Sequence, residues 1–364
     1  MTVREARLAA LAKRRERRVE GGAMHRAMPI DPWRLVSRSF TAEGFGESET
    51  MFAVANGYMG MRGTHDEGLP SHDPAVFVNG FHETWPIPYG ESAFGFATTG
   101  QTIVSAPDGS VMRLYVDEEP LVLSESKLLS YERVLDMRAG ILERSVRFRT
   151  ARGAVVELKS QRLVSLHWRH LAAISYEVTL ISGAAELAIA SELVTHLPRP
   201  KGGDDPRVGV RMTDSALEPV TQSCDGTRVV LELRTRSSGM GLACGMEHAI
   251  DTQLKYSIES SVEEDEGRVV FFLDAEPGIP ARVTKLLGYH HAERAASGDL
   301  CRRVNRTLDR AANDGFERVA EIQRERLDAF WEHSDITIEG PGDIQQAVRF
   351  NLFQLRQASA RVEG

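Results

Sequence analysis

The pattern of apolar and polar positions changes character near residue 290. Before that point, short runs alternate in polarity or are rich in β-branched residues, which is typical of β-strands. Turn signals such as Pro107-Asp108-Gly109 and Asp225-Gly226 separate the runs. Runs with strand character include Gln101–Val104, Val111–Val116, Ile141–Phe148, Ala154–Lys159, Leu171–Leu180, Arg228–Leu233, Val269–Leu273 and Ala281–Leu287. Strands at this spacing without helices between them predict a mainly β protein, with a large antiparallel β-sandwich domain over residues 30–290.

After residue 290 the apolar positions recur at helical spacing instead. Residues 292–313 and 314–333 predict two helices of a linker that spans residues 291–334. Residues 335–342 predict a short strand and a turn. The repeating apolar side chains of the linker are Phe316, Val319, Ile322, Leu327, Phe330 and Trp331.

Residues 343–358 predict one more helix, with an apolar stripe made by Val348, Leu352, Phe353 and Leu355. An apolar helix face needs a covering surface, and little sequence follows to supply one. The sequence therefore reads as the front part of a longer protein. In this chain alone we expect exposed apolar surface near Phe350, Leu352 and Phe353.

A basic leader occupies residues 1–29, and its clustered cations are Lys13, Arg14, Arg15, Arg17 and Arg18. We expect a disordered or helical leader, although such a run also suits an address or an anion-binding arm. No apolar segment follows the cations, so the leader does not resemble a secretory signal. Met24 and Met28 leave open a later translation start.

Composition and charge narrow the class of protein. The chain has 364 residues and a net charge of -8, which argues against a nucleic-acid partner. It contains no run of about 18 apolar residues that would span a membrane. Its three cysteines, Cys224, Cys244 and Cys301, are odd in number and far apart. This pattern favours a reducing compartment without a zinc site, so we expect a cytoplasmic protein.

The titratable residues do not reveal a complete active site. His167 and His170 would face opposite sides of a strand, and the adjacent pair His290-His291 is also unsuited to share a metal. We therefore predict no metal site. The carboxylates that stand out fit turns, the surface or ion pairs better than catalysis; they are Asp66, Glu67, Glu83, Asp136 and Glu143.

Two segments rich in glycine and aromatic residues carry the strongest signals. In Glu49–Gly63, Asn56-Gly57 is typical of a hairpin turn, and Tyr58 and Arg62 follow on the same loop. This loop is either a tight hairpin or a cover over a neighbouring cavity. In Val78–Tyr89, Trp85 lies beside prolines and suits either a stacking face for a sugar ring or an apolar plug between domains.

These segments resemble the N-terminal part of glycoside hydrolase family 65, which includes maltose, trehalose and kojibiose phosphorylases and related hydrolases. The resemblance covers residues from about 30 to 364 and rests on several motifs in the same order. They are Glu49–Gly63 followed by Asp66-Glu67-Gly68, then Phe81–Pro86, Tyr131–Met137, Arg162–Ser165, His170–Ile174, Trp331–Ile338 and Ile344–Leu355.

The resemblance implies a β-sandwich, a helical linker and then an (α/α)6 catalytic barrel, of which residues 335–364 would be the start. It implies inverting phosphorolysis of an α-glucosidic disaccharide to β-glucose 1-phosphate. The general acid, a barrel glutamate, is expected beyond Gly364, so no catalytic residue is assigned in this chain. Inorganic phosphate would be the co-substrate, with no other cofactor, and the full-length parent would be a homodimer.

The resemblance implies a mainly supporting part for this segment. The residues chosen as candidates for sugar contact are Asn56, Tyr58, Arg62 and Trp85. The alternatives are a hydrolase of the same family and a non-catalytic sugar-binding or scaffold module, since a β-sandwich can bind sugar without cleaving it.

Overall fold

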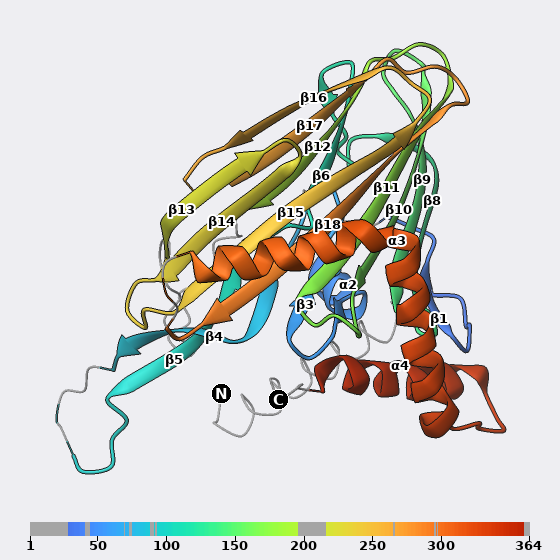
Figure 1. Ribbon diagram of the computed structural model, residues 1–364. Coiled ribbons are helices and arrows are strands. Elements are labelled where there is room, and N and C mark those ends of the chain that lie inside the picture. Colours follow the sequence, from blue (N-terminus) through green and yellow to red (C-terminus); the bar gives the residue numbers. More distant parts are fainter. Residues whose placement is uncertain are drawn as a thin grey trace, which may run out of the picture.

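The strands of the chain form three antiparallel sheets within the part that the structure describes. The structure is a computed structural model, and it describes residues 28–40, 44–68, 70–72, 75–87, 91, 93–195, 216–264, 266–294, 296 and 298–359. The leader predicted over residues 1–29 thus lies outside the described residues except for its last two positions. The mainly β fold and the helices at the C-terminal end agree with the prediction (Figure 1).

The largest sheet has nine strands. In their order across the sheet they are β1 (Arg34–Ser37), β8 (Lys127–Asp136), β9 (Ile141–Arg149), β10 (Val155–Val164), β11 (Leu171–Ser182), β18 (Pro280–Ala292), β15 (Gly241–Thr252), β14 (Arg228–Thr235) and β13 (Leu217–Asp225). The two pairings made by β18, with β11 and with β15, join segments more than 100 and about 40 residues apart in the chain, so long-range contacts hold the sheet together.

Two smaller sheets complete the β part. The five-stranded sheet contains, in order, β16 (Tyr256–Val262), β17 (Glu266–Leu273), β12 (Leu187–Val194), β6 (Met112–Val116) and β7 (Glu119–Pro120). The four-stranded sheet contains β2 (Val54–Ala55), β3 (Met59–Met61), β4 (Val76–Pro86) and β5 (Thr99–Ala106). The helices are α2 (Phe45–Met51), α3 (Asp299–Ser334) and α4 (Gly342–Ala358).

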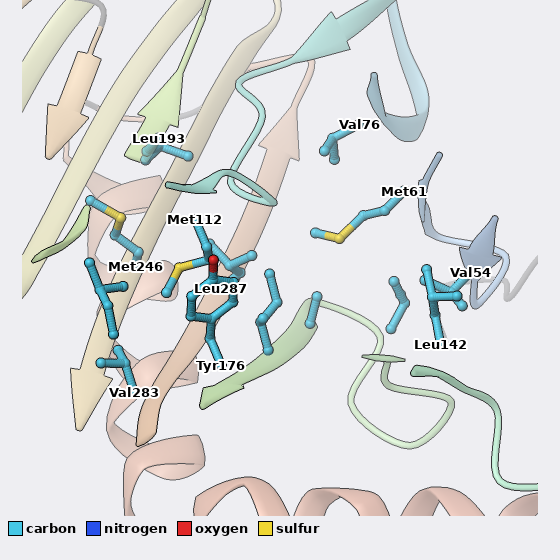
Figure 2. Close-up of a cluster of buried hydrophobic side chains, with 14 of the residues drawn as sticks. Val54, Met61, Val76, Met112, Leu142, Tyr176, Leu193, Met246, Val283 and Leu287 are labelled. Carbon is cyan, nitrogen blue, oxygen red and sulfur yellow. The ribbon is translucent and has the colours of Figure 1, made fainter. Parts of the chain in front are cut away.

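The main apolar core lies between the nine-stranded and five-stranded sheets and continues under the four-stranded sheet. Figure 2 shows side chains of all three sheets meeting there, among them Met61, Met112, Tyr176 and Met246. All four are at most 1% exposed. The alternation predicted for the strands thus produces a sandwich with one apolar face of each sheet turned inward.

Part of the outer face of the nine-stranded sheet is apolar as well, and α3 covers this part (Figure 1). On β11, Ala172 and Ile174 belong to the inner core, whereas Leu171 and Ala173 pack in the second cluster with α3. Burial on both faces explains why this strand reads as a continuous apolar run.

Two paired glycines allow α3 to approach the sheet closely. Gly245 on β15 lies opposite Gly288 on β18, and both face Val304 of α3. A Cβ atom on Gly245 would lie 2.8 Å from the Val304 Cγ1 atom, which is too close for a normal contact. A side chain at this position would push the helix away from the sheet.

The linker helices predicted over residues 292–313 and 314–333 are continuous except for a break at Gly315. This glycine has φ 72° and ψ 174°, which are not helical values. A positive φ is readily adopted by glycine, so the break occurs where the sequence supplies the residue for it.

The strand predicted within residues 335–342 does not form. The backbone there is instead bound by the side chain of Gln345, which accepts a hydrogen bond from the Ile338 amide at 2.8 Å and donates to the Ile336 carbonyl at 2.8 Å. A glutamine of the following helix therefore replaces the neighbouring strand that the prediction required.

The buried face of α4 also differs from the predicted apolar stripe. Its buried residues are Gln345, Gln346, Arg349, Phe353 and Gln357. Exposed apolar surface was predicted near Phe350, Leu352 and Phe353; Phe353 is buried, at 1% exposed, whereas Phe350 and Leu352 are half-buried. The large apolar side chains of α4 that are most exposed are Ile344, at 46%, and Leu355, at 66%.

Candidate functional site

The Asn56-Gly57 turn joins β2 to β3, as the sequence predicted, and Gly57 has a φ of 84°. The Asn56 side chain is fully buried. Its amide nitrogen donates to the carbonyl oxygens of Ser165 at 2.7 Å and Arg169 at 2.9 Å. Its oxygen accepts from the backbone amides of Tyr58 and Met59, each at 3.0 Å. These four bonds use the whole hydrogen-bonding capacity of the carboxamide, so Asn56 fastens its own turn to the turn between β10 and β11.

Tyr58 lies next to a cluster of histidines. Its hydroxyl is 3.0 Å from Nδ1 of His291, and its ring packs edge-on against His170 with a centroid distance of 4.4 Å. His170 in turn stacks on His290 at 3.8 Å. These residues meet because Leu171 on β11 pairs with Gly288 on β18, which brings the two histidine segments of the sequence together at the same end of these two strands.

The ring nitrogens of these histidines have defined partners. Nδ1 of His170 donates to the Tyr289 carbonyl at 3.0 Å, and Nε2 accepts from Nε of Arg169 at 3.2 Å. Burial, together with the neighbouring His170 and Arg303, lowers the pKa of His290 to about 3. His290 is therefore neutral at physiological pH.

Arg62 lies on the other side of the same loop and contacts α2. Its guanidinium donates to the Gly46 carbonyl at 3.1 Å and lies 3.4 Å from Oε2 of Glu49. The other Glu49 oxygen accepts the His72 amide at 2.6 Å. Arg62 thus braces the segment that leads into and out of the hairpin.

A buried group of charges fastens the following segment to the nine-stranded sheet. Asp66 pairs with Arg162 at 2.5 Å and Arg144 at 2.9 Å, and Ser160 donates to it at 2.5 Å. Glu67 receives two hydrogen bonds from Arg144, at 2.6 and 2.7 Å. Asp66 and Glu67 are thus ion-pair residues, which was one of the roles predicted for them.

The charges of this group compensate one another. Burial would raise the pKa of the Asp66 carboxyl, but the Arg144 and Arg162 guanidinium groups outweigh burial and hold that pKa below its ordinary value. The Asp66 carboxylate is therefore ionised and has no proton to donate, and both oxygens of Glu67 are bound by Arg144. The arrangement suits a structural role rather than general acid catalysis.

Trp85 lies in an arm formed by β4 and β5, which projects from the body of the molecule (Figure 1). It pairs with Gly100 on β5, where a Cβ atom would lie 2.5 Å from the indole ring. The ring therefore covers the glycine of the neighbouring strand. Glu83 holds the base of the arm by accepting the backbone amides of Ser237 and Ser238 at 2.9 and 2.6 Å.

The four residues predicted to contact sugar thus occupy three environments. Asn56 and Tyr58 lie together beside the β10–β11 turn, Arg62 faces α2, and Trp85 belongs to the arm. No group of three or more potential metal ligands occurs in the part of the chain that the structure describes. None of the described helices combines the length and apolar character needed to cross a membrane.

Comparison with known proteins identifies the family to which this architecture belongs. Residues 35–330 match the family model described as Glycosyl hydrolase family 65, N-terminal domain. The chain belongs to glycosyl hydrolase family 65. Within this family, an uncharacterized glycosyl hydrolase of Mycobacterium tuberculosis is 36% identical over 337 residues, 93% of this chain and 43% of that protein. An alpha,alpha-trehalose phosphorylase of Thermoanaerobacter brockii is 34% identical over 337 residues, 92% of this chain and 44% of that protein.

A solved structure shows the same fold. It is a human-microbiome protein provisionally named a kojibiose phosphorylase, with a TM-score of 0.81 and 19% identity over 91% of this chain and 42% of that one. This family 65 chain therefore spans less than half the length of the relatives that it matches.

The sequence did not reveal the histidine cluster as a unit, nor the buried Lys285. The Lys285 ammonium donates to the carbonyl oxygens of Val111 at 3.1 Å and Glu192 at 2.7 Å, and it links the two large sheets. Burial lowers its pKa to about 7. The histidine cluster depends on the pairing of β18 with β11, and the contacts of Lys285 depend on the packing of the two sheets. Neither arrangement leaves a local pattern in the sequence.

Proposed function

We propose that this chain is the N-terminal part of an enzyme that cleaves an α-linked disaccharide by inverting phosphorolysis. The proposal is supported chiefly by the 34% identity to an alpha,alpha-trehalose phosphorylase across 92% of the chain. Trehalose is accordingly the first candidate substrate, with maltose and kojibiose as further candidates. Phosphate would attack the anomeric carbon as the glycosidic oxygen is protonated, and the products would be β-glucose 1-phosphate and glucose.

In this proposal the described residues support catalysis carried out elsewhere. The carboxylates of the buried charge group are bound to arginines, and the general acid is assigned to a barrel glutamate beyond Gly364. Helix α4 would be the first barrel helix, and the sandwich would support the barrel. Phosphate is a co-substrate rather than a cofactor, and we further propose a cytoplasmic homodimer.

The direct test uses the full encoded protein. It is incubated with trehalose, maltose, kojibiose or nigerose, with and without phosphate, while glucose and β-glucose 1-phosphate are measured. We expect sugar phosphate only when phosphate is present, with trehalose as the best substrate. Glucose released without phosphate would instead indicate a hydrolase, as the name of the mycobacterial relative suggests. No turnover by a folded protein would favour a sugar-binding or scaffold module.

Substitution of Trp85 tests whether the arm contributes to sugar binding. If its indole is a stacking face, Trp85→Ala should raise KM and leave kcat almost unchanged, because stacking binds the ground state and the transition state equally. Phe94→Ala is the matched control, since Phe94 is a fully exposed aromatic residue of the same arm. Equal kinetic effects of the two substitutions would rule out a specific role for Trp85.

A further inference from the structure

A cavity of about 210 Å³ lies between the β10–β11 turn and the first half of α3. The turn supplies His167, Trp168, Arg169 and His170, and the helix supplies Thr307 and Arg310. Pockets for drug-sized ligands are roughly 300–1,000 Å³, so this cavity suits a smaller molecule. The β10–β11 turn is well positioned, because the Asn56 side chain binds two of its carbonyl groups.

The charge of this cavity is opposite to that of the chain. The chain has a net charge of -8, yet Arg169 and Arg310 line the cavity and none of the carboxylates that the structure describes does. Arg310 is exposed and makes no ion pair with any described residue. Arg326 adds another cation at the edge, because it donates to Nδ1 of His167 at 2.9 Å.

The positive charges near the cavity also affect the pKa of the neighbouring His290. His290 stacks on His170 directly behind the cavity lining, and Arg169 and Arg303 both act to lower its pKa. The arginines of the lining and the effect of Arg169 on the pKa of a nearby histidine thus both indicate positive potential at one place. A positive, partly enclosed cavity favours an anion.

The side chains also favour one type of anion. Arginine presents planar N–H groups that match phosphate oxygens, and guanidinium groups are the usual choice where phosphate is recognised. Trp168 offers an aromatic surface beside these cations, which suits the apolar face of a sugar ring. We propose that this cavity binds a small phosphate-bearing ligand, either inorganic phosphate or the phosphate group of a monosaccharide phosphate.

In this arrangement Arg169 and Arg310 bind the phosphate from the turn and from the helix. Asn56 and Tyr58 act as positioning residues, since Asn56 binds the Arg169 carbonyl and Tyr58 packs on His170. The proposal does not depend on whether the enzyme is a phosphorylase or a hydrolase, because it concerns binding by the described residues alone.

Binding is tested by titration calorimetry on the full encoded protein, with inorganic phosphate, β-glucose 1-phosphate, glucose 6-phosphate and glucose as separate probes. We expect a saturable binding event for phosphate-bearing probes that weakens as salt is added. Arg310→Gln should weaken this event by about tenfold, because it removes a hydrogen bond between charged groups. Phosphate that binds as tightly as the sugar phosphates would identify free phosphate as the ligand, and tighter binding of a sugar phosphate would identify the ester.

Arg306→Gln is the matched control, since Arg306 is exposed one turn earlier on α3 and does not line the cavity. It should leave the binding event unchanged, and both variants should keep the wild-type melting temperature. Equal losses in the two variants, no event sensitive to Arg310→Gln, or glucose binding as tightly as its phosphates would each overturn the proposal.

The outcome can be separated from that of the catalytic proposal. A phosphate site in the rest of a phosphorylase would produce a second binding event, which Arg310→Gln should leave in place. A protein without turnover can still show the Arg310-dependent event. Conversely, an active phosphorylase in which Arg310→Gln changes no binding event would contradict only the cavity proposal.

Discussion

Helices α3 and α4 both pack against the β-sandwich, but different chemistry holds each of them. The first half of α3 buries Leu300, Val304 and Leu308 against apolar side chains on the outer face of the nine-stranded sheet. The buried face of α4 instead presents Gln346, Arg349 and Gln357, together with only one large apolar residue, Phe353.

The polar face of α4 binds backbone groups that have no strand or helix partner. Gln357 accepts the Ala55 amide at 2.6 Å, and Gln346 donates to the Arg34 carbonyl at 2.8 Å. Arg349 forms a two-point pair with Asp335 at 2.7 and 2.8 Å and lies 3.8 Å from the centre of the Trp33 ring. An apolar face suffices where a helix covers side chains, whereas a helix that covers strand ends must satisfy their backbone groups.

The segment around Asp66 is an extreme case of the polar arrangement. It has no helix or strand, and buried ion pairs attach it to the sheet. Removing one member of a buried charge group leaves the others without compensation. We therefore expect a single substitution that preserves shape to lower stability more at the polar contacts than at the apolar contacts.

The largest effect is expected at the buried charges. Asp66→Asn should lower the free energy of unfolding by about 3–5 kcal/mol, because Arg162 and Arg144 then lie buried with too little negative charge. Chemical denaturation measures this change. Glu132→Gln is the control, since its pair with Arg38 is exposed. A loss at Asp66 no larger than that of the control would show that the charges are not needed.

The same group also predicts a pH dependence. The pKa of Asp66 is lower in the folded protein than in the unfolded chain, so its contribution is complete above the unfolded value near 3.8. As the pH falls below that value the unfolded chain takes up the proton first, and stability decreases. Melting temperatures measured from pH 6 downward should therefore fall less steeply in Asp66→Asn than in the wild type, and parallel curves would contradict this origin.

The apolar attachment of α3 comes next. Leu308→Ala should cost roughly 2–5 kcal/mol of unfolding free energy, because Leu308 is fully buried and its removal leaves a cavity against the sheet. Leu355→Ala, at an exposed leucine of α4, should change stability by no more than about 0.5 kcal/mol. Similar costs at both leucines would mean that α3 does not pack as described.

A smaller loss of unfolding free energy is expected where α4 binds the strand ends. Gln357→Leu keeps a similar size but removes the bond to the Ala55 amide, which should cost about 1–3 kcal/mol. Hydrogen exchange of the Ala55 amide should speed up in parallel, and this readout reports the contact itself. A more stable variant would show that apolar contact alone is enough to attach α4.

The smallest effect is expected on the exposed side of α3. Arg324 and Asp328 pair at 2.9 Å, but 41% and 46% of their side chains are exposed. Asp328→Asn should cost only about 0.3–0.5 kcal/mol, because solvent screens the pair. A loss comparable to that of Asp66→Asn would remove the distinction between buried and exposed charges in this protein.

The sequence predicted the central strands well because their alternation depends only on neighbouring residues. Edge strands were harder to find: β13 and β16 are almost entirely exposed and carry no inward apolar pattern. The break near residue 314 was also predictable, since Gly315 is a local signal. The strand expected within residues 335–342 was wrong because Gln345 binds that backbone instead.

The candidate site was predictable only in part. The Asn56-Gly57 turn is a local signal, but the partners of Asn56 lie more than 100 residues away. The contact of Tyr58 with His170 and His291 likewise depends on the pairing of β11 with β18. Sugar contact by Asn56, Tyr58, Arg62 and Trp85 stays a prediction.

The sequence alone determined the β-sandwich, the helices that follow it and the family, because apolar periodicity, turn residues and motifs are all local features. Only the tertiary structure decided which polar groups meet: Asp66 with two arginines, α4 with the strand ends, and four cavity-lining residues of one turn with Arg310 of α3. The physical reason is that apolar burial is non-directional and needs only a pattern. Hydrogen bonds and ion pairs need particular partners, and in this protein those partners come from distant parts of the chain.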